Sequence, residues 1–212
     1  MVFNLPLAFP ILLVIGRYHQ TPFVSLLFMI VATMYSGMVS VTMMVFEKRI
    51  WPVPTYFPVS FLSSIRLKVF IPVVLFVLES LILLGLFIAQ TPSAIYDVFM
   101  IAPIAMILYY CSLLGIRLFL QDPDRDISQR NRLLKGSEVL RLEAVSIGFS
   151  VGFYGAFYCL KTFLIEGSFL FFERLPPWSV ILLLAGILIA LLALLLRSIQ
   201  MERRKIHRLL VE

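Results

Sequence analysis

The chain has 212 residues, of which 61% are hydrophobic and 14% are charged. A water-soluble domain carries roughly 25% charged residues, so this composition excludes a soluble enzyme or binding domain and predicts a membrane protein. The net charge of +6 does not indicate a nucleic-acid partner. The basic residues lie in polar segments beside apolar runs, where the positive-inside rule places them in membrane proteins.

Six apolar runs predict an all-α, polytopic integral membrane protein with about six transmembrane helices. The first run is short and contains two prolines, which leaves three alternatives: a thin or tilted span, a re-entrant segment, or the remnant of a span that begins upstream. The second run carries a stripe of small residues, Ala32, Ser36 and Ser40, which we expect to pack against another helix. The runs cover approximately residues 2–16, 22–46, 69–90, 95–118, 142–165 and 179–196.

The charges of the connecting segments predict the orientation of these spans. With a cytoplasmic N-terminus, fifteen of the 18 lysines and arginines fall on the cytoplasmic side: fourteen in loops 47–68 and 119–141 and in the tail 197–212, and Arg117 at the end of the fourth run. We therefore expect both termini in the cytoplasm. Residues 166–178 are apolar and aromatic but broken by glycine and proline, which predicts an external re-entrant segment with its aromatic side chains at headgroup depth.

The first cytoplasmic loop, residues 47–68, contains a short predicted helix. Pro58 suits the first turn of a helix, because the N–H that proline lacks would have no partner there. After it, Phe61, Leu62 and Ile65 follow at spacings of three and four and form one apolar stripe. A free helix this short is marginal in water, so we expect it to lie against another surface.

This loop also resembles a known one. Glu47-Lys48, then Pro58-Val59-Ser60 about a dozen residues later, then Lys68 ten residues beyond, are similar in order and spacing to the first cytoplasmic loop of type-2 ABC exporter permeases. In that family the loop carries a coupling helix, which docks in a groove of a separate ATPase subunit. The resemblance implies that the ATPase contact is made by Glu47, Pro58, Val59, Ser60, Phe61, Ile65, Arg66 and Lys68.

The resemblance further implies a transport subunit that is not itself an enzyme. The sequence has no GxxxxGK[ST] phosphate loop, so ATP and magnesium would bind to the partner ATPase and no cofactor to this chain. A second permease, identical or different, would complete the pathway in a bacterial or archaeal plasma membrane. The apolar interior favours a lipid-like, peptide or drug-like substrate.

Glu79 lies at the centre of the third apolar run. A carboxylate at mid-bilayer is costly and usually faces a bundle interior or a watery path. We therefore expect Glu79 to line a substrate pathway together with Ser36, Ser40 and Tyr109. The alternative is a glutamate that braces two helices through a hydrogen bond, to Tyr109 or Ser40.

Asp122, Asp124 and Asp126 suggest a different function. They do not form a calcium loop, because Ile127 and Leu133 stand where glycine and glutamate are required. The segment is similar to the first aspartate-rich loop of intramembrane prenyltransferases, but the second acidic loop of that family is missing. The alternatives are thus a prenyltransferase-like enzyme, recognisable by magnesium binding at these aspartates, or a non-catalytic accessory subunit.

Small residues in the later runs are expected to be structural. Gly148 and Gly152 form a GxxxG spacing with Gly155 one turn further, which predicts a helix-packing face. Cys111 and Cys159 lie in apolar runs and are expected to be small core residues, not a disulfide or metal site. No group of residues has the spacing of a metal site.

Overall fold

The fold was described from a computed structural model, and the description covers residues 22–49, 61–88, 98–121, 134–166 and 176–211. Every regular element in these ranges is an α-helix, which confirms the all-α prediction. The helices are α2 (Pro22–Arg49), α3 (Phe61–Ile88), α4 (Val98–Leu120), α5 (Gly136–Glu166) and α6 (Pro177–Val211).

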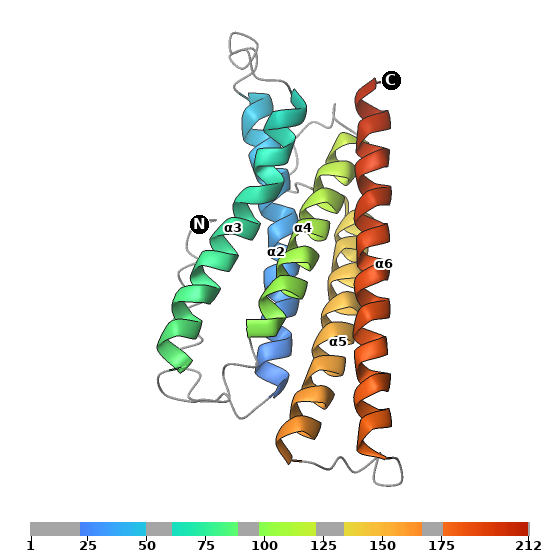
Figure 1. The fold of residues 1–212 in the computed structure, drawn as a ribbon. Coiled ribbons are helices and arrows are strands. Elements are labelled where there is room, and N and C mark those ends of the chain that lie inside the picture. The colour runs from blue at the N-terminus through green and yellow to red at the C-terminus, as the bar shows by residue number, and fades with distance from the viewer. Residues whose placement is uncertain (1–21, 50–60, 89–97, 122–133, 167–175, 212) are drawn as a thin grey trace.

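The helices stand side by side and alternate in direction, with α4 at the centre (Figure 1). Helix α4 contacts all four other helices, and its second half, Ile107 to Phe119, is buried on every side except at Tyr109. Apolar side chains all around a helix are typical of an element enclosed by others. Helix α4 is therefore the element on which the bundle is assembled.

Four of the described helical stretches are long and apolar enough to cross a bilayer: Met29–Glu47, Val98–Leu120, Gly136–Leu164 and Trp178–Leu209. They agree with four of the predicted spans. The predicted first run, 2–16, lies outside the described residues, as does most of the predicted external segment. For part of α3, including Glu79, the structure describes the helix but not the side chains.

Two predicted boundaries differ from the structure. Helix α3 begins at Phe61 and continues without a break through Lys68 into the apolar run, so residues 61–66 are not a short helix separate from the third span. Neither glycine nor proline occurs between Phe61 and Ile71 to interrupt the helix. At the other side of the loop, α2 extends to Arg49. The polar connection is therefore shorter than the predicted 47–68.

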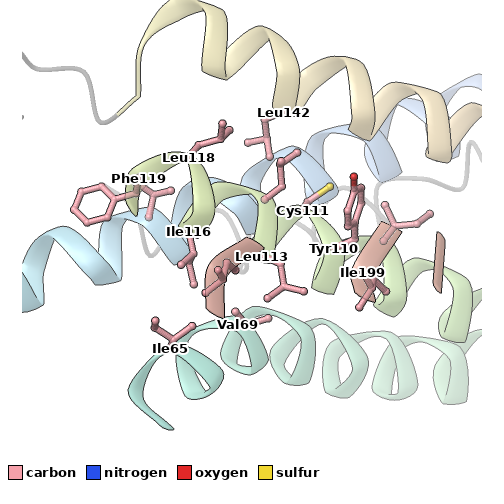
Figure 2. Packing of buried hydrophobic residues seen from close by; sticks show 14 of the residues in the cluster. Ile65, Val69, Tyr110, Cys111, Leu113, Ile116, Leu118, Phe119, Leu142 and Ile199 are labelled. Carbon is pink, nitrogen blue, oxygen red and sulfur yellow. The ribbon is translucent and has the colours of Figure 1, made fainter. Parts of the chain in front are cut away.

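The core is concentrated at one end of the bundle, where α2, α4 and α6 end and α3 and α5 begin. Figure 2 shows Ile65 and Val69 of α3 facing the side chains of α4, with Leu142 and Ile199 contributed by α5 and α6. Away from this end α3 diverges from its neighbours (Figure 1). Its exposed apolar residues there are Val74, Leu75, Leu78, Leu81 and Ile82.

Candidate functional site at the junction of α2 and α3

A buried ion pair joins the end of α2 to the start of α3. The ammonium group of Lys68 pairs with the carboxylate of Glu47, and the two side chains are only 10% and 17% exposed. The Lys68 Nζ also donates a hydrogen bond to Ser64 Oγ at 2.9 Å, and Ser64 Oγ donates to Glu47 Oε1 at 3.0 Å. These three side chains tie together the two helices that flank residues 50–60.

A further hydrogen bond extends the junction along α2. The Ser40 hydroxyl lies 3.2 Å from the Lys68 carbonyl oxygen and 3.0 Å from the Ser36 carbonyl oxygen, with the geometry to donate to either. Lys68 precedes the apolar run that begins at residue 69, and burial lowers the pKa of its ammonium group to about 8. The pair with Glu47 therefore keeps its full charge only below that pH.

Helix α2 is joined to α4 by direct contact between their backbones. A Cβ atom placed on Gly115 would lie 2.6 Å from the Gly37 carbonyl oxygen, so only glycine fits at this crossing. Beside it, Ser36 Oγ donates to the Leu108 carbonyl at 3.1 Å, and Ser112 Oγ donates to the Ser36 carbonyl at 3.3 Å. Small residues and interhelical hydrogen bonds are the usual means of helix association in lipid.

One turn before Gly37, α2 is joined to α5 by hydroxyl groups. Thr33, Ser146 and Ser150 are all fully buried, the Thr33 and Ser146 hydroxyls contact each other, and Ser146 Oγ donates to the Ile30 carbonyl at 3.0 Å. Because each hydroxyl finds a partner, this polar cluster does not leave an unsatisfied group in the core.

A second buried ion pair joins α4 to α6. Arg117 Nε lies 2.9 Å from Glu202 Oε2, but the two atoms are not aligned as a hydrogen bond, so charge attraction holds them. Lys205 Nζ lies 3.1 Å from the other carboxylate oxygen. On the same side, Arg203 Nε donates to the Tyr109 hydroxyl at 3.0 Å, and its guanidinium lies 5.3 Å from the centre of that ring.

The structure revises the predicted ATPase contacts. Ile65 is only 4% exposed and packs in the core, so it offers no surface to a partner and the prediction for this residue is wrong. Glu47 and Lys68 bind each other within the chain. Arg66 is exposed, as expected, and the adjacent Leu67, which sequence analysis missed, is 62% exposed. The predicted contacts whose side chains lie outside the described residues are Pro58, Val59, Ser60 and Phe61.

Three of the four predicted pathway residues, Ser36, Ser40 and Tyr109, have described side chains. Ser36 and Ser40 are buried and bond to main-chain carbonyls of α4 and α3, which confirms that their stripe packs against other helices. Tyr109 is partly buried and holds Arg203. The side chain of Glu79 lies outside the described residues, so its place in a pathway or in a helix-bracing hydrogen bond stays a prediction.

The prediction that the glycine face of α5 packs against a helix is mostly wrong for the described helices of this chain. No atom of the described residues lies within 4 Å of a Cβ built on Gly148 or Gly155, whereas a Cβ on Gly152 meets Leu191 at 3.4 Å. Cys111 is fully buried, as predicted. The aspartate-rich segment, 122–126, lies outside the described residues, and no group of three or more potential metal ligands occurs among the residues that are described.

Comparison with known proteins identifies one family. No curated protein and no solved structure matches this chain. Residues 1–197 match the model of a family described as "Membrane protein of 12 TMs". This match extends over most of the 212 residues, and it agrees with the four helices that are long and apolar enough to span a bilayer. The chain therefore belongs to this family of multi-span membrane proteins.

Proposed function

We propose that the chain is the permease subunit of an ABC exporter, which moves a lipid-like, peptide or drug-like substrate. A separate ATPase subunit, which binds ATP and magnesium, would act on the segment between α2 and α3 at the cytoplasmic side. The observation that carries this proposal is the junction of Glu47, Ser64 and Lys68, because it fastens together the two helices on either side of that segment.

The packing supplies a route for a movement that starts at this junction. A force on residues 50–60 displaces α2 and α3 together, since their ends are joined by a buried ion pair. Helix α2 passes the displacement to α4, because at Gly37 and Gly115 the two backbones touch and no side chain intervenes to absorb it. Closely packed helices with few alternative arrangements are the elements through which such shifts travel.

The contact with the ATPase is reassigned to the exposed side of α3. Arg66 and Leu67 point away from the core formed by Ile65 and Val69. Leu67 is 62% exposed and would add apolar contact area beside Arg66, and arginine is one of the residue types enriched at interface hot spots. Arg66 would contribute steering by charge.

The pairing of two permeases is also part of the proposal. The family description names twelve transmembrane segments, which is twice the six apolar runs of this sequence. Two six-span units, either two copies of this chain or this chain with a different partner, would supply that number. The pathway would then lie between them.

The proposal is tested by site-specific photo-crosslinking. A photo-reactive phenylalanine analogue replaces Leu67 in one variant and Leu140, an equally exposed leucine in the first turns of α5, in a matched control. We expect the residue 67 variant to crosslink, in native membranes, to a protein that has a phosphate-binding loop and hydrolyses ATP, and the control not to. Absence of any ATPase from the residue 67 adduct, or equal labelling from both positions, would contradict the proposal.

A further inference from the structure

Helix α6 exposes one continuous stripe along its length. Residues at spacings of three and four are exposed from Leu183 through Ala190 and Ala193, and then Arg197, Met201, Arg204 and Arg208 continue the same face. The opposite face is buried and includes Leu184, Leu195, Ile199, Glu202 and Ile206. The outer stripe is therefore apolar along the first half of the helix and carries arginines along the second.

The length of α6 places the change from apolar to basic at a definite depth. Trp178 is 66% exposed and belongs to the residue type that concentrates at membrane interfaces. Arg197 follows Trp178 by 19 residues, or about 28 Å of helix, which is close to the roughly 30 Å of a bilayer's hydrocarbon core. Arg204 lies about 10 Å further along the axis. With Trp178 at one interface, Arg197 would lie in the opposite headgroup layer and Arg204 at its outer edge.

The charges of this stripe are free to bind a ligand, whereas neighbouring charges are not. Arg203 is turned onto Tyr109 and Lys205 pairs with Glu202. In the part of the chain that the structure describes, Arg197, Arg204 and Arg208 have no ion-pair partner, and no acidic side chain is exposed. Among the described residues, the stripe therefore presents positive charge that no exposed carboxylate cancels.

We propose that this stripe is a binding surface for an anionic phospholipid. The acyl chain would lie along Ala190 and Ala193, and the phosphate would contact Arg197 and Arg204, whose planar guanidinium groups suit bidentate phosphate binding. Arg208 would attract the additional negative charge of the headgroup. A lipid fits better than an acidic protein surface. The exposed side chains along α6 change from apolar to basic, and a phospholipid changes in the same order from its acyl tail to its anionic headgroup.

The test measures lipid affinity on the purified full chain in neutral detergent, by thermophoresis with a fluorescent short-chain phosphatidylglycerol or phosphatidylcholine. The variant Arg197→Gln/Arg204→Gln is compared with Lys135→Gln/Arg141→Gln, which removes the same charge from exposed sites at the start of α5. A basic residue near an anionic lipid surface contributes about 1 kcal/mol, or roughly fivefold. We expect wild type to prefer phosphatidylglycerol and the α6 variant to lose that preference by tenfold or more, with less than threefold change in the control.

Three outcomes would overturn the proposal. The first is an unchanged lipid preference in the α6 variant. The second is an equal loss in the Lys135/Arg141 variant, which would indicate only a general effect of net charge. The third is loss of binding to an ATPase subunit with lipid affinity intact, which would assign the arginines to a protein contact. If the α6 variant does not fold, the wild type still decides the question, because a preference that persists unchanged at high salt would also exclude the ionic contact.

Discussion

Replacement of Gly115 by alanine tests the crossing of α2 and α4 directly. The added Cβ atom would lie 2.6 Å from the Gly37 carbonyl oxygen and 3.2 Å from its Cα. Both are main-chain atoms, so no side-chain rotation can relieve the overlap. Ordinary contact begins at 3.4 Å, so the two helices must separate by about 0.8 Å at this point, given that packed interiors leave little spare volume.

The expected cost follows from two losses and one gain. Overpacking of this kind costs about 1–3 kcal/mol. Separation of the helices weakens the hydrogen bonds from Ser36 to Leu108 and from Ser112 to Ser36, at about 0.6 kcal/mol each in a membrane protein. Alanine recovers about 1 kcal/mol through its higher helix propensity. The free energy of unfolding should therefore fall by about 1–3 kcal/mol.

The matched control is Gly148→Ala in α5, where an added Cβ meets no atom within 4 Å. It should leave stability unchanged or raise it by up to about 1 kcal/mol. Both variants are unfolded reversibly by sodium dodecyl sulfate in mixed micelles and followed by tryptophan fluorescence. Equal stability of Gly115→Ala and Gly148→Ala would refute the close backbone crossing.

Two further substitutions test the junction and the predicted pathway. Glu47→Leu alone leaves Lys68 buried without its partner and should lower the free energy of unfolding by as much as about 3–5 kcal/mol. The double variant Glu47→Leu/Lys68→Met should recover most of this loss. A double variant as unstable as the single one would show that the pair is not a buried one. Glu79→Gln should reduce transport in vesicles while the amount of assembled protein stays the same, and unchanged transport would remove Glu79 from the pathway.

The number and kind of helices were predictable from the sequence, because the bilayer leaves a chain few alternatives. Backbone groups in hydrocarbon must bond within the segment, so a long apolar run predicts a helix. Hydropathy marks where the membrane ends, however, and not where the helix ends. Helix α6 continues beyond residue 196 because Ile199, Glu202 and Ile206 pack against the bundle, and this packing depends on residues far away in the sequence.

The glycines show where sequence reasoning fails at the candidate site. The GxxxG spacing in α5 identifies a face that another helix is able to approach, but spacing does not reveal which helix lies there. Within this chain, Ser146 and Ser150 face α2, and Gly148 faces outward. Gly37 and Gly115, which do form a close contact, are single glycines on two different helices. No local motif distinguishes them, so only the fold identifies the pair.

The divergence of α3 from the rest of the bundle has a mechanical consequence. The helix is buried at Ile65, Lys68 and Val69 near its start, and its apolar residues farther along, such as Leu78 and Ile82, are exposed among the residues that the structure describes. It has 28 residues, or about 42 Å, and is anchored at one end. A tilt of about 5° at the anchor would swing the far tip by roughly 4 Å, so under the proposed function α3 would act as a lever arm that converts a small displacement on one membrane surface into a larger one on the other.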